Sequence, residues 1–187
     1  RRARSQSCWK RALSSRKSNS VLFDTHCHLD TERFDADREA VFARAHAVGV
    51  TRFLNPSYDL DSSRRAAALA ASRADVVAAV GIHPNDAARY DADAAAVLRD
   101  LAAAGPKQVV AIGEIGLDYH WNIADPATQK AVFVAQLALA RDLDLPVIIH
   151  SRDAYDDTLD ILEAEWRGRP LVLHSFGGAI NHAERAL

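Results

Sequence analysis

The sequence alternates short β-branched apolar runs with Ala- and Leu-rich runs of helical period, and this alternation constrains the fold more than any other feature. Such runs predict strands and helices in turn, which is the pattern of repeated βα units around a parallel sheet. The six predicted strands are residues 21–28, 51–56, 76–84, 109–118, 146–151 and 171–176. The five predicted helices between them are residues 35–48, 60–71, 92–103, 127–143 and 155–166.

Each predicted strand ends near a polar residue or a proline, and these ends recur at intervals of 28, 28, 30, 36 and 24 residues. The residues concerned are His28, Pro56, Pro84, Glu114, His150 and His174. A repeated parallel βα unit can form an open doubly wound sheet or a closed eight-stranded barrel, and only the barrel gathers all strand ends around one site. We therefore predict the α/β class, with a TIM (β/α)8-type barrel of which residues 21–187 supply about six βα units.

The composition agrees with one globular domain, since 49% of the residues are apolar and 26% are charged. No apolar run approaches the roughly 20 residues that a transmembrane helix needs, so we expect no membrane partner. The two cysteines, Cys8 and Cys27, are too few for a disulfide framework or a four-thiolate zinc site. These features favour a reducing compartment, and we expect a cytoplasmic monomer.

Charge is divided unevenly along the chain. Residues 1–20 contain seven Lys or Arg and no acid, so the formal charge of −2 leaves −9 for the rest. This segment has the composition of disordered upstream sequence, of an organellar transit segment or of a nucleic-acid-binding tail, and of these we favour the disordered segment. The acidic remainder has no broad basic surface, so a polyanionic substrate would require metal ions or a small cationic patch.

Two histidines and an aspartate share one side of the first predicted strand. The period of two sends Asp24, His26 and His28 to the same face. A lone histidine there would be a hydrogen-bonded core residue, whereas two histidines beside a carboxylate favour a metal site. Asp24 is then placed to orient one of the two ligands.

Three later strands end in further residue types that bind metals. Glu114 and Asp118 share a face of the fourth strand, where a buried carboxylate needs a cationic partner. His150 ends the fifth strand and His174 ends the sixth. Glu114, His150 and His174 therefore join the histidine pair of the first strand as five ligands at four strand ends.

Five such ligands exceed what one tetrahedral ion requires. A carboxylate between two histidine pairs can bridge two metals about 3.5–4 Å apart. The residues therefore predict a two-metal hydrolase with Glu114 between the ions. Mg²⁺, Mn²⁺ and Zn²⁺ are all open, and the many imidazoles favour zinc mildly.

Five ordered strings of this sequence resemble the TatD-type metal-dependent deoxyribonucleases. They are DTHCHLD (24–30), GIHP (81–84), GEIGLDY (113–119), LPVIIHSRDA (145–154) and HSFGG (174–178). The resemblance covers the chain from Val21 to Gly178. It implies a TIM-barrel hydrolase that cleaves phosphodiester bonds in DNA, as an exonuclease on single-stranded DNA or 3' ends, with two divalent ions that are usually Mg²⁺.

The same resemblance assigns roles residue by residue to the five ligands. His26 and His28 resemble the ligands of one metal. Glu114 is similar to the family's bridging, catalytic carboxylate, and His150 and His174 resemble the ligands of the other metal.

Three more positions match the family's motifs. His83 resembles the catalytic and substrate-binding histidine near the scissile phosphate. Asp118 and Arg152 occupy motif positions that imply substrate binding, and a salt bridge that orders the strand ends is an equally good interpretation of these two residues.

The sequence departs from the family pattern in two places. HSFGG replaces the commoner HCFSG form and leaves His174 untouched. A Glu-Thr-Asp-x-Pro string at the end of the eighth strand, whose Asp completes the first metal site, does not occur before Leu187. We therefore expect a C-terminally truncated fragment of a longer gene product or an impaired protein.

Two alternative functions stay open. A related barrel hydrolase acting on amide, ester or phosphotriester substrates would use the same pair of histidines and carboxylate, since the scaffold does not decide the substrate. A truncated, catalytically impaired remnant that binds metal without turnover is the second alternative. Activity on single-stranded DNA with Mg²⁺, compared with activity on small amides or esters with Zn²⁺, separates the enzymes, and metal binding without hydrolysis would favour the remnant.

Overall fold

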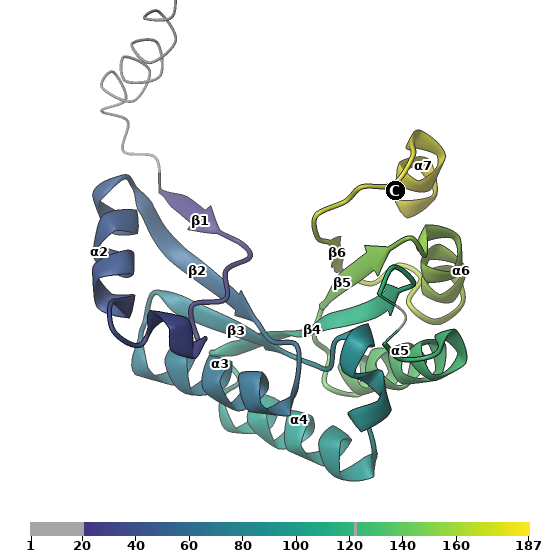
Figure 1. Cartoon of the computed structure of the whole chain (residues 1–187), viewed down its shortest axis with the longest axis horizontal. Helices are drawn as coiled ribbons and strands as arrows, with labels where there is room; N and C mark the ends of the chain where they lie inside the picture. The colour runs from purple at the N-terminus through teal and green to yellow at the C-terminus, as the bar shows by residue number, and fades with distance from the viewer. Residues whose placement is uncertain (1–20, 122) are drawn as a thin grey trace, which may run out of the picture.

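The computed structural model describes residues 21–121 and 123–187, and it consists of one parallel sheet with helices along its outer side (Figure 1). The sheet has six strands hydrogen-bonded in sequence order, and every neighbouring pair is parallel. They are β1 (Leu22–Asp24), β2 (Val50–Pro56), β3 (Val76–Val80), β4 (Val109–Asp118), β5 (Val147–Arg152) and β6 (Leu171–Leu173). The sheet curls into an arc, which confirms the predicted βα array as part of a barrel.

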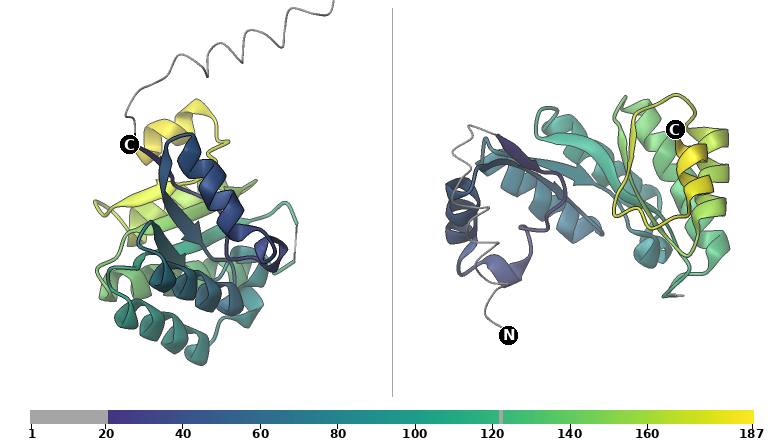
Figure 2. Two further views of the ribbon diagram at one scale, coloured as in Figure 1. Left: turned by 90° about the vertical axis from the view of Figure 1, so that its left-hand side faces the viewer. Right: turned by 90° about the horizontal axis from the view of Figure 1, so that it is seen from above.

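Five helices of the described chain connect successive strands and cover the convex side of the arc, and a sixth follows β6 (Figure 2). They are α2 (Arg38–Ala47), α3 (Leu60–Ser72), α4 (Ala92–Ala104), α5 (Pro126–Asp142), α6 (Tyr155–Glu165) and α7 (Ile180–Ala186). Two short 3-10 helices, η1 (Glu32–Phe34) and η2 (Pro84–Arg89), lie in the loops after β1 and β3. Within the described ranges, no helix is both long enough and apolar enough to cross a membrane.

Local sequence explains where the helices start. The carboxylate of Asp59 accepts the backbone N–H of Ser62 at 2.6 Å, and the Ser62 hydroxyl bonds back to the Asp59 N–H, so α3 begins with a complete capping box. At the start of α4, the carboxylate of Asp91 accepts the backbone N–H of Ala94. These caps satisfy N–H groups that have no partner inside the helix.

The sheet packs differently on its two faces. The large core lies between the sheet and the helices and includes Phe42, Phe53, Phe133 and Trp166, each at most 2% exposed. Alternate strand residues on the other face form a small cluster of Ala79, Ala111 and Ile148, with Leu54 against it. Because side chains alternate along a strand, this second cluster is the inner face of the arc.

Three predicted strands extend beyond the observed β1, β3 and β6. The four histidines predicted near those strand ends lie instead on the loops that follow: His26, His28, His83 and His174. At β1, the exposed carboxylate of Asp24 accepts the backbone N–H of His26 at 3.2 Å, and this local bond replaces a ladder bond. The alternation that was expected to place the two histidines of the first motif therefore stops before them.

The outer strands of the sheet leave apolar side chains open to solvent. Leu22 and Phe23 of β1 are each 48% exposed, and Val172 of β6 is 56% exposed. Each of these two strands pairs on one side only within the described part of the chain. The basic segment expected at residues 1–20 lies outside the described residues.

Candidate metal centre

The ends of five strands bring one continuous cluster of histidines and carboxylates together. Three groups of three residues in the described part of the chain each have ligand atoms within 4.8 Å of one another. The groups are His26 with His28 and Glu114, Glu114 with His150 and His174, and His83 with Asp118 and His150. Because two residues are shared between groups, all five predicted ligands converge, with His83 and Asp118 beside them.

Glu114 lies between the two histidine pairs. Its Oε1 atom is 2.6 Å from His26 Nε2 and 3.0 Å from His174 Nε2, and the residue is only 5% exposed. The rings of His26 and His174 stack with their centroids 4.3 Å apart. One carboxylate oxygen therefore contacts an imidazole from the first strand end and one from the sixth.

Close packing of β4 against β5 sets the position of this carboxylate. Gly116 pairs with His150 across the two strands, and its φ of 136° lies in a region that side chains disfavour. A Cβ atom at Gly116 would overlap the carbonyl oxygen of His150. The backbone N–H of Glu114 donates to the carbonyl of Ser57 at 2.7 Å, which joins the site to the loop after β2.

Backbone contacts determine which nitrogen His28 presents to the cluster. Its Nδ1 atom lies 3.0 Å from the carbonyl oxygen of Pro56, and a carbonyl can only accept. His28 therefore carries its proton on Nδ1 and leaves the Nε2 lone pair for a ligand. His26 differs, because its Nδ1 atom is buried and has no hydrogen-bond partner among the residues that the structure describes.

Asp118 orients His150. Its Oδ2 atom is 3.0 Å from His150 Nε2, and its Oδ1 atom accepts the backbone N–H groups of His120 and Trp121 at 3.0 and 3.2 Å. With Nε2 donating to the carboxylate, His150 directs its Nδ1 lone pair toward His174 Nε2, 3.2 Å away. A carboxylate behind a histidine is the usual support of a metal-ligating imidazole.

The charges of the cluster suit cation binding. Burial alone would raise the pKa of Glu114, but the hydrogen bond from His26 and the neighbouring imidazoles bring that pKa down to about 2. Burial lowers the pKa of His174 to about 4, because desolvation disfavours the imidazolium form and neighbouring histidines add to it. At pH 7 the cluster therefore combines a carboxylate anion with a neutral imidazole.

His83 is a neutral donor rather than a free base. Its Nδ1 atom accepts the backbone N–H of Asn85 at 3.1 Å, which leaves the proton on Nε2. Burial, followed by repulsion from His150, lowers the pKa of His83 to about 4. Its ring lies 4.3 Å from the ring of His150, and one of its ring nitrogens is within 4.8 Å of ligand atoms of Asp118 and His150.

The three remaining sequence assignments have different outcomes. Within the described residues, Asp24 accepts the backbone N–H of His26 and bonds to no imidazole ring, so the expected orientation of a ligand ring by Asp24 is wrong for this structure. Asp118 forms no ion pair with Arg152 among the described residues, so the salt-bridge interpretation does not hold. Arg152 is exposed, and its guanidinium carbon lies 5.4 Å from the ring centroid of Trp121.

Sequence reasoning missed the role of the loop after β4. The pairing of Asp118 with His150 spans 32 residues, and no local pattern reveals it. Trp121, which is 57% exposed, lies beside this pair, and the sequence pattern did not identify it as a functional residue. Its position two residues after the GEIGLDY string was the available signal.

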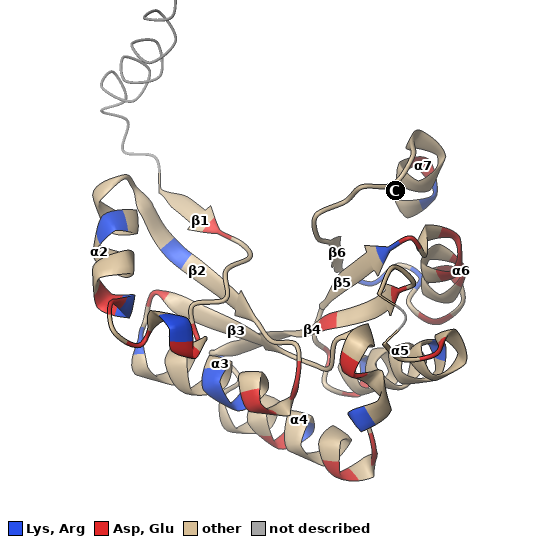
Figure 3. Cartoon of the chain, viewed as in Figure 1, with Lys and Arg blue, Asp and Glu red and all other residues tan. Residues whose placement is uncertain are grey.

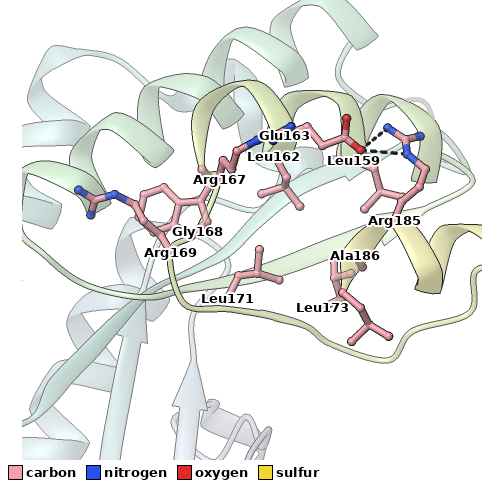
Figure 4. Close-up of a pocket in the computed structure, with 12 residues that line it drawn as sticks. Leu159, Leu162, Glu163, Arg167, Gly168, Arg169, Leu171, Leu173, Arg185 and Ala186 are labelled. Atoms are coloured by element: carbon pink, nitrogen blue, oxygen red, sulfur yellow. Dashed lines mark hydrogen bonds and ion pairs between the residues drawn. The ribbon is translucent and has the colours of Figure 1, made fainter.

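Charged residues are spread over the helices and loops of the described chain, and the described strands contain only two Lys or Arg residues, Arg52 and Arg152 (Figure 3). A cavity of about 630 Å³ lies elsewhere, between α6, β6 and α7 (Figure 4). Its lining includes Leu162, Leu173 and Leu187, and its Glu163 is already paired with Arg185 at 3.0 Å. The strand-end cluster is therefore the better candidate for chemistry.

Parallel βα units that carry imidazoles and a buried carboxylate at their carboxyl edge are typical of the class of metal-dependent barrel hydrolases. Comparison with known proteins narrows the class. Residues 23–187 match the family described as TatD related DNase. The chain belongs to this family.

Individual relatives agree with the family. The chain is 40% identical over 170 residues to the uncharacterized metal-dependent hydrolase YabD of Bacillus subtilis (strain 168). This alignment covers 89% of this chain and 65% of that protein. The chain is also 40% identical over 167 residues to the 3'-5' ssDNA/RNA exonuclease TatD of Cronobacter sakazakii (strain ATCC BAA-894), with 89% and 63% covered. The structure matches YJJV, a TATD homolog from Escherichia coli K12, with a TM-score of 0.83 and 34% identity over 90% of this chain and 65% of that chain. The chain thus spans slightly less than two thirds of the length of these relatives.

Proposed function

We propose that the protein binds two divalent cations at the strand-end cluster and hydrolyses phosphodiester bonds of single-stranded DNA from 3' ends. The observation that carries the proposal is the position of Glu114 Oε1, 2.6 Å from His26 Nε2 and 3.0 Å from His174 Nε2. One carboxylate oxygen in contact with both histidine pairs suits a bridge between two ions. The name of the Cronobacter relative, a 3'-5' ssDNA/RNA exonuclease, supports the substrate class.

The donor set fits divalent cations. Within the described part of the chain, His26 Nδ1 is a buried nitrogen without a hydrogen-bond partner, and the lone pairs of His28 and His150 are directed by the hydrogen bonds of their other ring nitrogens. His26, His28 and Glu114 would hold one ion, and Glu114, His150 and His174 the other. When bound, such ions would stabilise negative charge on a phosphodiester and lower the pKa of water.

The remaining residues of the cluster act on the substrate or on the ligands. His83 donates from Nε2 to a phosphate oxygen, because its Nδ1 is held by the N–H of Asn85. Asp118 keeps the His150 ring in one orientation and one tautomer through its Oδ2 atom. The low pKa of Glu114 keeps its carboxylate ionised at neutral pH, so no proton has to leave when cations bind.

We propose Mg²⁺ as the working ion, with Mn²⁺ and Zn²⁺ as the ions to compare, because carboxylate oxygen suits Mg²⁺ and Mn²⁺ whereas the imidazole nitrogens suit Zn²⁺. The acidic body of the protein supports a metal-assisted approach of a polyanion, since residues 21–187 carry a formal charge of −9. We also propose a cytoplasmic monomer. Within the described residues Cys27 is a free thiol, which agrees with a reducing compartment.

The experiment measures nucleotide release by the full gene product from single-stranded DNA labelled at its 3' or its 5' end. We expect release of the 3' label first, dependence on added Mg²⁺, and a strong loss in Glu114→Gln. Glu184→Gln on the exposed side of α7 is the matched control and should resemble wild type.

Two results would overturn the proposal. Hydrolysis of small amides, esters or phosphotriesters with Zn²⁺ in the absence of DNA cleavage would assign the site to a different barrel hydrolase. Metal binding without turnover on any of these substrates would leave a metal-binding protein without nuclease activity.

A further inference from the structure

We propose that Trp121, held in place by Arg152, is a stacking platform for a base of the nucleic-acid strand beside the metal centre. The inference rests on the proposed function and names a contact of the substrate that the metal cluster does not supply. The platform lies in the loop between β4 and α5.

Trp121 combines exposure with a fixed orientation. The residue is 57% exposed, although the indole ring is among the largest apolar groups of the chain. The ring of His120 stands perpendicular to it at 87°, with centroids 4.7 Å apart. The Arg152 guanidinium lies 5.4 Å from its centroid, within the range of a cation–π contact. An exposed ring held by two neighbours is ready to receive a flat partner.

The carboxylate of Asp118 connects the backbone of Trp121 to the metal centre. Asp118 Oδ1 accepts the backbone N–H of Trp121 at 3.2 Å, while Asp118 Oδ2 bonds to His150 Nε2 at 3.0 Å. Two hydrogen bonds thus separate the backbone of Trp121 from a proposed metal ligand. A strand whose phosphate lies at the metal centre would pass its neighbouring bases over this loop.

The charge around the ring suits a phosphate backbone. None of the ion pairs found in residues 21–121 and 123–187 involves Arg152, whereas its neighbour Asp153 is paired with His120 at 3.0 Å. The guanidinium of Arg152 is therefore available to a phosphate group, although the protein is acidic overall. Aromatic stacking with an adjacent cation is the usual recognition of single strands.

This chemistry favours single-stranded over double-stranded nucleic acid. A stacked base must be unpaired to lie on an indole face, and any of the four bases offers such a face. We therefore expect the contact to be tolerant of sequence and to be absent with blunt duplex DNA.

The first test measures binding of a fluorescent dT oligonucleotide to the full gene product by anisotropy, without need of turnover. We expect Trp121→Ala to raise Kd about tenfold, Trp121→Phe to restore most of the affinity, and Arg152→Gln to lower the salt slope by about 0.7. Val48→Ala is the matched control, since Val48 is 71% exposed at the end of α2. A Trp121→Ala variant that binds as tightly as Val48→Ala would overturn the proposal.

The second test separates this proposal from the proposed function. For each variant, kcat/KM is measured on the oligonucleotide and on methyl p-nitrophenyl phosphate, a diester without a base. We expect Trp121→Ala to lower kcat/KM on the oligonucleotide about tenfold relative to kcat/KM on the small diester, because KM for the oligonucleotide rises. If wild type cleaves neither diester while binding still depends on Trp121, the proposed function is wrong and the platform stands. If wild type cleaves DNA and the ratio of the two kcat/KM values does not change in Trp121→Ala, the platform alone is wrong.

Discussion

At the scale of the residue, Asp118 is a buried carboxylate whose two oxygens have separate partners. One oxygen receives two backbone N–H groups of the following loop, and the other receives the ring of His150. The residue is 1% exposed, so an incoming substrate reaches its neighbours more easily than it reaches Asp118 itself. This position favours a role in orienting His150 over the direct substrate contact that the motif implied.

We expect Asp118→Asn to weaken metal binding about 10- to 100-fold while the fold is retained, because His150 loses its anionic support. Calorimetric titration with Mn²⁺ measures the effect. Asp153→Asn is the control, since Asp153 is an exposed carboxylate on the same edge that pairs with His120. Equal metal affinity in the two variants would show that Asp118 has no part in the metal site.

His83 offers a separate test of the site. His83→Ala removes a donor to the phosphate but no proposed ligand, so we expect kcat on single-stranded DNA to fall about 10²-fold with metal content unchanged. His46→Ala, at the salt bridge of α2 with Asp75, is the control. Loss of bound metal in His83→Ala would instead identify His83 as a ligand.

Much of the site could be predicted from the sequence, because metal-binding residue types occur at the ends of the predicted strands. Glu114, His150 and His174 were expected to converge, and they do. The tautomers could not be predicted, since they depend on partners distant in sequence: Pro56 for His28 and Asp118 for His150. Trp121 was missed because exposure is a property of the folded loop.

At the scale of the element, helices were predicted within a few residues and strands less well. Range 109–118 agrees with β4 at both ends, because its apolar run continues through the sheet. β1 ends at Asp24, four residues earlier than expected, because the Asp24 carboxylate accepts the backbone N–H of His26 in place of a strand partner. η1, η2 and α7 were not predicted, since each is short and lacks a long apolar period.

The capping box of α3 is expected to stabilise the fold. We expect Asp59→Ala to reduce the free energy of unfolding by about 1 kcal/mol, because the N–H of Ser62 loses its acceptor. Asp59→Asn is the control and should stay close to wild type, since Asn caps equally well. Urea denaturation followed by circular dichroism measures both, and equal losses in the two variants would contradict the capping account.

At the scale of the whole molecule, the arc gathers residues that are far apart in the sequence onto one edge. His26 and His174 are stacked although they lie on loops after the first and last strands of the sheet. The curl of the sheet (Figure 1) is therefore what completes the cluster, and Glu114 joins its two halves. A flat sheet with the same strand order would hold the two outer histidines apart.

The central claim is that Glu114 holds two ions between the histidine pairs. The most direct test is the metal content of the full gene product and of Glu114→Gln, measured by mass spectrometry after equilibrium dialysis against Mn²⁺. We expect two ions per wild-type chain and a marked loss of both in the variant, because one carboxylate contributes to both sites. Two ions retained in Glu114→Gln, or a single ion in wild type, would contradict the two-ion account.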